Sequence, residues 1–150
     1  MDDIPIRIFR ISEEFNDLPL PNYMTEGSAG MDLCAAVNES IVISPMSSAL
    51  VPTNLIVELP IGFEAQIRPR SGLAFRNKVI LPNSPGTIDS DYRGEIKVIM
   101  MNLGNEPFMI NRGDRIAQMV ISEYKKVRWE EAKSLGGTNR GEGGFGSTGK

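Results

Sequence analysis

One short stretch of the chain, Asn83 to Glu95, gathers two aspartates, a tyrosine and an arginine between turn-forming residues. Strand-like sequence follows it at once, so we expect a β-hairpin or tight loop at the rim of a sheet. Loops held by such a scaffold often carry function, and a carboxylate there could act as a general base. The alternative is a solvated hairpin tip, because Asp and Ser favour turns for local reasons.

A second stretch, Arg68 to Gly72, combines two arginines with a serine and a glycine. Guanidinium groups match phosphate oxygens, and a glycine lets backbone N–H groups come close to them. We also expect Ser71 to be the N-cap of one short helical turn. The stretch predicts an oxyanion-binding loop, and the alternative is a surface turn with incidental arginines.

Gln118 lies in a strand-like segment where Ile116 and Val120 share its parity. This pattern predicts that Gln118 faces inward with those two residues. A buried amide must find hydrogen-bond partners, and a phosphate oxygen could be one of them.

The last stretch, residues 136–150, is rich in glycine and poor in large apolar side chains. Its Gly141–Gly146 segment matches GxGxxG in form, but a dinucleotide fold would need a strand before it and a helix after it. We therefore expect one β domain over residues 1–135 and a flexible tail over 136–150. Such a tail could close over a phosphorylated ligand.

The elements that position these residues are short strands separated by Gly and Pro turns, without a helical stripe of more than two turns. This pattern predicts an all-β fold, a sandwich or barrel. We expect strands at residues 4–9, 31–37, 41–43, 49–51, 55–59, 63–68, 79–81, 94–103, 108–110 and 115–121.

Composition sets limits on the chemistry. The 150 residues contain no histidine, which excludes a Ser-His-Asp triad and histidine-ligated zinc. Any metal must then be a hard cation held by oxygen. Cys34 is the single cysteine and fits a reducing compartment. The acidic start, the lack of a long apolar run and the net charge of −3 predict a cytoplasmic protein without a membrane or direct nucleic-acid partner.

Five segments in order resemble the five motifs of the trimeric dUTP pyrophosphatases: residues 29–33, 70–74, 86–94, 112–118 and 140–149. The resemblance implies a jelly-roll-like, distorted β-barrel or sandwich. It also implies a homotrimer with three sites at subunit boundaries, each lined by motifs from all three chains. Lys78 stands where the family commonly has a glycine, which puts a local turn in doubt.

The resemblance also implies roles for single residues. Asp89 would be the general base that activates the attacking water, and Tyr92 would pack under the deoxyribose. Mg²⁺ would be held through its waters by Asp32. Uracil would be bound mainly through main-chain groups of Asn83, Thr87, Ile88 and Lys97. The α- and β-phosphates would be held by Arg70, Ser71, Gly72 and Gln118, and the tail would contribute Arg140, Phe145, Gly146, Ser147 and Thr148.

The activity implied is hydrolysis of dUTP to dUMP and diphosphate with Mg²⁺. One alternative is a dCTP deaminase of the same fold, for which the resemblance implies Arg-Ser-Ser-Leu-Ala where this chain has Arg70–Ala74. The other is a nucleotide-binding module without catalysis. An intact Asp89 and a complete tail argue against that module.

Overall fold

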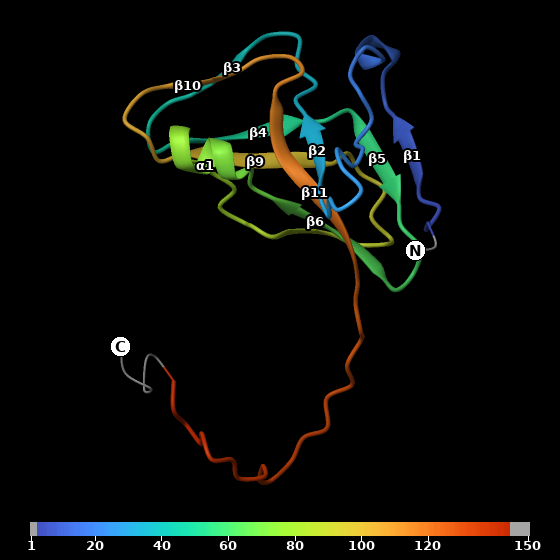
Figure 1. Cartoon of the computed structure of the whole chain (residues 1–150), viewed down its shortest axis with the longest axis vertical. Coiled ribbons are helices and arrows are strands. Elements are labelled where there is room, and N and C mark those ends of the chain that lie inside the picture. The colour runs from blue at the N-terminus through green and yellow to red at the C-terminus, as the bar shows by residue number, and fades with distance from the viewer. Residues whose placement is uncertain (1–2, 145–150) are drawn as a thin grey trace.

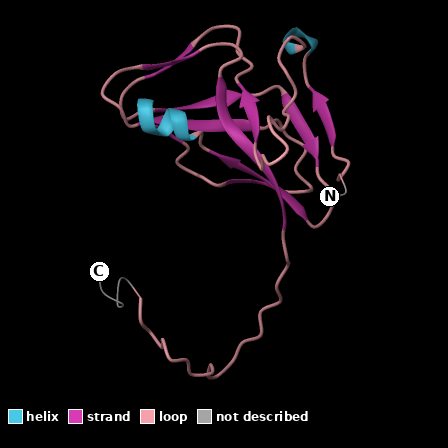
Figure 2. Ribbon diagram, in the orientation of Figure 1, coloured by secondary structure: helices cyan, strands magenta, loops and turns pink. Residues whose placement is uncertain are grey.

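The computed structural model describes residues 3–144 and is built of short strands with little helix (Figures 1 and 2). In chain order the elements are β1 (Arg7–Arg10), the 3₁₀ turn η1 (Glu13–Phe15), β2 (Met31–Cys34), β3 (Ile41–Ile43), β4 (Ser48–Pro52), β5 (Leu55–Glu58), β6 (Phe63–Arg68), α1 (Ser71–Asn77), β7 (Val79–Ile80), β8 (Gly86–Ile88), β9 (Lys97–Asn102), β10 (Phe108–Ile110) and β11 (Arg115–Glu123).

The strands pair antiparallel in every sheet of the described chain. One sheet has the order β2-β11-β6-β8 and a second has the order β4-β9-β7, while β1-β5 and β10-β3 form two-stranded sheets. The arrangement is a jelly-roll-like sandwich and confirms the predicted all-β fold.

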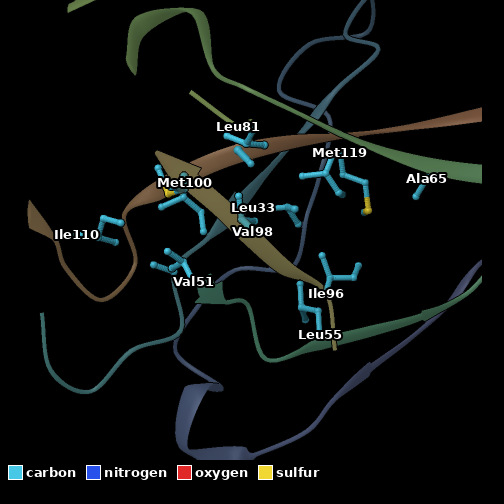
Figure 3. Close-up of a cluster of buried hydrophobic side chains, with 14 of the residues drawn as sticks. Leu33, Val51, Leu55, Ala65, Leu81, Ile96, Val98, Met100, Ile110 and Met119 are labelled. Carbon is cyan, nitrogen blue, oxygen red and sulfur yellow. The ribbon is translucent and has the colours of Figure 1, made fainter. Parts of the chain in front are cut away.

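The core lies between the two larger sheets because their strands alternate in burial. In β9, Val98 and Met100 are buried while Lys97 and Ile99 are exposed, as the two-residue period of a strand requires. Figure 3 shows these side chains beside Leu33 and Met119 of the other sheet. Each large apolar side chain buried in this way contributes about 1.5–3 kcal/mol, which makes the sandwich a firm support for its loops.

The expected strands at 41–43, 63–68 and 108–110 have the observed bounds, whereas the one expected over 94–103 begins only at Lys97. The backbone before Lys97 bonds elsewhere: Ile96 N–H donates to Leu55 O at 2.8 Å, and Asn54 N–H donates to the Glu95 carboxylate. These contacts with the β4–β5 turn end the ladder early.

The stretch between β8 and β9 is a loop and not a hairpin. β8 pairs with β6 in the four-stranded sheet, while β9 pairs with β4 and β7 in the other. The loop therefore crosses from one sheet to the other, and its residues lie at the border of both.

The helix α1 begins one residue earlier than expected and has two turns. Arg70 is its N-cap, with extended backbone and no side-chain capping bond, so the prediction that Ser71 caps the helix is wrong. A guanidinium has no acceptor for the first helical N–H groups, and the Arg70 side chain pairs with Asp32. At the other end Lys78 adopts φ 56° and its N–H bonds to Ala74 O, so the turn forms without the glycine.

The expectation that Gln118 shares a face with Ile116 is also wrong. The register between β11 and β2 shifts between Arg115 and Ala117, so Ile116 and Ala117 are both buried. Beyond this bulge Gln118 lies half-buried on the same face as Val120.

After β11 the chain leaves the sheets, and residues 124–144 carry neither helix nor strand (Figure 1). Trp129 in this segment is 90% exposed, and Val127 and Leu135 are exposed as well. Within residues 3–144, helices long and apolar enough to cross a membrane are absent.

Candidate active site

A pocket of about 390 Å³ opens where the loop crosses between the two sheets. Six of the residues that line it were predicted from the sequence to bind or act on substrate: Asn83, Thr87, Ile88, Asp89, Tyr92 and Lys97. The other three, Leu50, Glu95 and Ile99, were missed. Leu50 and Ile99 carried a signal, because each is an apolar residue at an outward position of its strand.

Among residues 3–144, two strand edges that border this pocket are unpaired. In that part of the chain β8 is the last strand of its sheet and pairs only with β6. The first four residues of β9, from Lys97, pair with β4, whereas β7 pairs only with Met101 and Asn102. Main-chain N–H and C=O groups along both edges are therefore available to a flat, hydrogen-bonding ring.

The loop that carries Asp89 is braced by its own residues. Tyr92 N–H donates to Asp89 O at 3.1 Å, and Arg93 donates to Ser90 O at 2.8 Å while also facing Glu58 at 3.5 Å. Within the described residues the Asp89 carboxylate is exposed and makes no hydrogen bond or ion pair. It is therefore available to a water molecule.

Tyr92 is held against the main chain of the same loop. Its hydroxyl donates to Glu95 O at 3.0 Å. A Cβ on Gly94 would collide with the Tyr92 ring, so only glycine allows the ring to lie this close to the backbone. The ring thus forms a fixed wall of the pocket.

The predicted phosphate-binding residues meet elsewhere, around Asp32. Arg70 Nε donates to Asp32 Oδ1 at 2.9 Å, and Arg115 Nη1 lies 3.2 Å from Asp32 Oδ2. Gln118 Nε2 donates to Pro69 O at 2.9 Å on the chain that leads into Arg70. The cluster of one carboxylate and two guanidinium groups carries a net positive charge, which suits an anion.

Ser71 and Gly72 form the start of α1 next to this cluster. A Cβ on Gly72 would lie 2.7 Å from the Arg76 guanidinium, so the side chain of Arg76 occupies that space. Arg76 was missed because the sequence predicted only one helical turn, whereas α1 has two and brings the side chain of Arg76 back over Gly72.

Asp89 and Arg70 lie at opposite ends of β6. Ile88 is opposite Ala65, so the next residue, Asp89, reaches the level of Glu64, and both line a second pocket of about 470 Å³. Arg70 follows Glu64 by six residues. An extended chain of that length spans roughly 20 Å.

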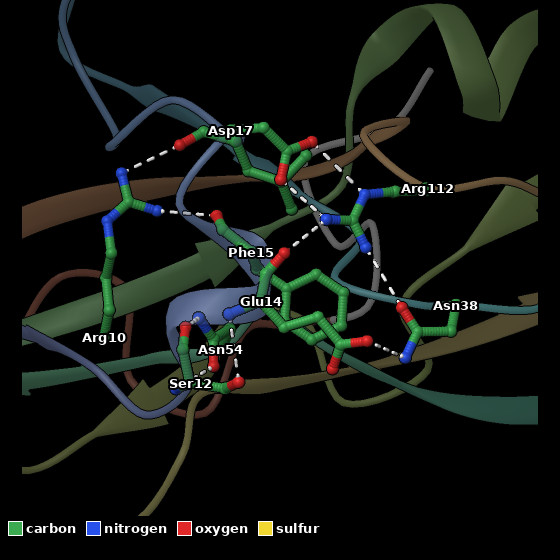
Figure 4. Close-up of polar contacts among 9 residues, drawn as sticks. Arg10, Ser12, Glu14, Phe15, Asp17, Asn38, Asn54 and Arg112 are labelled. Atoms are coloured by element: carbon green, nitrogen blue, oxygen red, sulfur yellow. Dashed lines mark hydrogen bonds and ion pairs between the residues drawn. The ribbon is translucent and has the colours of Figure 1, made fainter.

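Charged contacts also fix the turn before β11 (Figure 4). Arg112 pairs with Asp17 at 2.6 Å, donates to Asn38 at 3.0 Å and lies over the Phe15 ring at 4.5 Å. The hydrogen bond between them lowers the pKa of Asp17 and raises that of Arg112. Burial raises the pKa of the Cys34 thiol, and the nearby charge of Asp32 adds to the shift.

Arg140 lies in the exposed segment after β11, where its Nε donates to Gly143 O at 2.7 Å. The structure therefore does not bring it to the pocket or to the Asp32 cluster within one chain. Four predicted tail residues lie outside the described residues: Phe145, Gly146, Ser147 and Thr148.

The donor set fits a hydrated Mg²⁺ that arrives with a triphosphate, and not a cage of protein ligands. Among residues 3–144, groups of three or more acidic, His or Cys side chains that could hold a metal are absent. Asp32 is a single carboxylate with 22% of its side chain exposed. Mg²⁺ usually keeps several waters and takes one or two carboxylates besides substrate phosphates.

Comparison with known proteins places the chain in a family. The dUTPase family model matches residues 16–149. The chain is 59% identical over 130 residues to the deoxyuridine 5'-triphosphate nucleotidohydrolase of Rickettsia conorii, covering 87% of this chain and 88% of the relative.

Solved structures share the fold. A Staphylococcus bacteriophage 80alpha dUTPase variant with dUpNHpp has a TM-score of 0.84 at 23% identity, covering 97% of this chain and 99% of that one. A dUTPase variant from phage phi11 of S. aureus, described with a structural Mg(II) ion, has a TM-score of 0.77 at 21% identity, with 88% and 99% covered. The family match and the Rickettsia relative together show that the chain belongs to the dUTPase family.

Proposed function

We propose that the chain hydrolyses dUTP to dUMP and diphosphate, which limits uracil incorporation into DNA and supplies dUMP for thymidylate synthesis. The observation that carries the proposal is the single pocket that collects Asp89, Tyr92 and the four residues predicted to bind uracil. Membership of the dUTPase family and the name of the Rickettsia relative support it.

Uracil would lie between the two unpaired edges of β8 and β9. Main-chain donors and acceptors at Thr87, Ile88 and Lys97 can read its O4 and N3–H edge, with Asn83 beside them. Cytosine presents the reverse pattern and would leave these groups unpaired. A site built in this way discriminates by a factor on the order of 10⁴.

Asp89 would accept a proton from the attacking water. The water oxygen then forms a bond to the α-phosphorus, and the bond from that phosphorus to the oxygen bridging to the β-phosphorus breaks in line with it. The bridging oxygen leaves with the bonding electrons as part of diphosphate. The exposed, unpaired carboxylate of Asp89 supports this role.

The phosphates would be held by Arg70, Ser71, Gly72 and Gln118. Asp32 would hold Mg²⁺ through its waters, and it also keeps the Arg70 side chain in place. When bound, Mg²⁺ would neutralise charge on the phosphate oxygens. These residues around Asp32 would thus contribute by positioning the phosphates and neutralising their charge.

One site would be shared between chains of a homotrimer. Asp89 must act next to the phosphates that Arg70 holds, yet the two residues of one chain are separated by roughly 20 Å along β6. An Arg70 from a second chain removes this conflict. The exposed Val127, Trp129 and Leu135 also support an assembly, since an isolated chain leaves them in water.

The tail, residues 136–150, would close the site from a third chain. It would bring Arg140, Ser147 and Thr148 to the γ-phosphate, with Gly146 between them and Phe145 stacked on uracil.

We place the reaction in the cytoplasm, because the single Cys34 fits a reducing compartment. A nucleotide substrate and other copies of the chain are the partners that it needs.

The proposal is tested by measuring diphosphate and ammonia release from dUTP, UTP, dCTP and dTTP, with and without Mg²⁺. We expect diphosphate from dUTP, stimulated by Mg²⁺, and far less from the other three nucleotides. Ammonia from dCTP would instead indicate the deaminase. Binding of dUTP without any product would indicate a nucleotide-binding module.

A further inference from the structure

Glu95 lies at the end of the loop that carries Asp89, and three separate contacts meet on it. Its side chain is only 19% exposed, although the residue lines the pocket beside Tyr92 and Lys97. The sequence motifs did not single it out, and the proposed chemistry does not use it.

The first contact is with the wall of the pocket. The main-chain oxygen of Glu95 accepts the hydrogen bond from the Tyr92 hydroxyl at 3.0 Å. The ring lies over Gly94, the residue before Glu95, and has no room to move closer. The position of the ring therefore depends on where the Glu95 backbone is held.

The second contact holds that backbone to the frame of the fold. Glu95 Oε1 accepts from Asn54 N–H at 2.9 Å. Asn54 is buried in the β4–β5 turn at φ 62°, and its side-chain amide bonds to both the N–H and the C=O of Ser12 at 2.9 Å. One oxygen of the carboxylate thus fixes the loop to a turn that is itself tied to the N-terminal segment.

The third contact is with another residue that lines the pocket. Glu95 Oε2 lies 3.5 Å from Lys97 Nζ, and Lys97 begins the unpaired edge of β9. Glu95 therefore contacts Tyr92 through its main-chain oxygen and Lys97 through its carboxylate.

The charge of Glu95 is unexpected at a site for a polyanion. A negative group there repels a triphosphate, so its removal should improve binding if the carboxylate has no other role. We propose that Glu95 is a positioning residue that sets the spacing between Tyr92 and Lys97, and so the choice of deoxyribose over ribose. This inference rests on the proposed function. It predicts that removing the charge of Glu95 weakens dUTP binding, whereas simple repulsion of the triphosphate predicts that binding improves.

The test compares Glu95→Gln and Glu95→Asp with the wild type. Glutamine keeps an acceptor for Asn54 N–H and removes the charge facing Lys97, while aspartate keeps the charge and shortens the reach by one methylene. Glu39→Gln is the matched control. Glu39 is exposed before β3 and does not line the pocket, so this substitution removes the same charge at a distance from the site. kcat and KM are measured for dUTP and UTP, together with the thermal midpoint.

We expect both Glu95 variants to raise KM for dUTP on the order of tenfold and to lower the dUTP/UTP ratio of kcat/KM. The control should match the wild type. Thermal midpoints near that of the wild type would show that the folded frame is kept. An unchanged dUTP/UTP ratio of kcat/KM would overturn the inference. A lower KM in Glu95→Gln with wild-type behaviour in Glu95→Asp would also overturn it, because it would show that only the charge matters.

Calorimetric binding of dUMP and UMP separates this inference from the proposed function. If the wild type releases no diphosphate from dUTP, the proposed function fails. The binding comparison still tests Glu95: loss of the dUMP preference in both variants supports its role, and an unchanged preference overturns it.

Lys97→Met adds a double-mutant cycle. The double variant Glu95→Gln/Lys97→Met should lose less than the sum of the two single losses, and an additive loss would remove Lys97 from the argument.

Discussion

Asp89 lies level with Glu64 near the start of strand β6, and Arg70 lies two residues beyond the end of that strand, roughly 20 Å away along it. One chain thus presents two incomplete halves, a pocket with a free carboxylate and a cluster of arginines around Asp32.

Tyr92→Ala should narrow the preference for dUTP over UTP. The ring that forms the sugar-side wall is gone, so a 2′-hydroxyl finds room. Ratios of kcat/KM for the two nucleotides measure the effect. Tyr92→Phe is the comparison: it keeps the ring over Gly94 and loses only the hydrogen bond to Glu95 O, so its dUTP/UTP ratio should fall less than that of Tyr92→Ala. A wild-type ratio in Tyr92→Ala would place sugar discrimination elsewhere.

Truncation after Leu135 should leave the thermal midpoint nearly unchanged and sharply reduce turnover. The removed residues include Arg140, Phe145, Ser147 and Thr148, and few apolar groups that could join a core. In the proposed mechanism the tail would exclude water and align the γ-phosphate, so its loss should lower kcat and raise KM. Differential scanning fluorimetry and steady-state kinetics check the two parts. Hydrolysis at the full-length rate would reduce the tail to a linker.

Lys78→Gly should raise the free energy of unfolding by about 0.5–1 kcal/mol. Lys78 has φ 56° at the end of α1, where glycine avoids the clash of a Cβ with the backbone. Urea denaturation measures the change. Lys78→Ala retains the Cβ and should give no such gain, and equal effects of the two variants would contradict the role of backbone strain.

Asp17→Asn should lower the thermal midpoint at neutral pH and have little effect in acid. The pKa of Asp17 is lowered in the folded chain by its hydrogen bond with Arg112. The stability from this pair is therefore present above the unfolded pKa and is lost as the pH falls through the folded one. The midpoints of the variant and the wild type should approach each other as the pH is lowered from 7 to below the ordinary pKa of aspartate, about 3.9.

Asp3→Asn serves as the control for the pair. It removes an exposed carboxylate near the N-terminus and should not change the midpoint. A constant difference between Asp17→Asn and the wild type at every pH would show that the effect does not come from the charge of Asp17.

Local signals predicted most strands, because alternation and turn residues act over a few positions. Turn residues also placed Asp89 and Tyr92 in a loop at the rim of a sheet. The other predicted residues of the pocket, Asn83, Thr87, Ile88 and Lys97, came from the resemblance to the dUTP pyrophosphatases. What they could not show depends on contacts between distant segments. The assignment of β8 and β9 to different sheets follows from pairings with β6 and β4.

The details that the sequence did not predict also depend on contacts between distant segments. Glu95 meets Asn54 across 41 positions, and Arg115 meets Asp32 across 83. The bulge in β11 that breaks the parity of Gln118 arises from its register with β2. None of these contacts leaves a pattern in the neighbouring sequence.

Complementation of two inactive variants tests the shared site most directly. Asp89→Asn removes the proposed base and Arg70→Ala removes a proposed phosphate contact, so each variant alone should lose on the order of 10²-fold or more in kcat. Co-expressed in equal amounts, they should form mixed trimers in which Asp89 of one chain meets Arg70 of another. Random assembly makes about three quarters of the trimers mixed, and each mixed trimer has one intact site out of three. The expected activity is therefore about a quarter of the wild-type activity. Analytical ultracentrifugation verifies the trimers, and mixed trimers no more active than their parents would contradict the account.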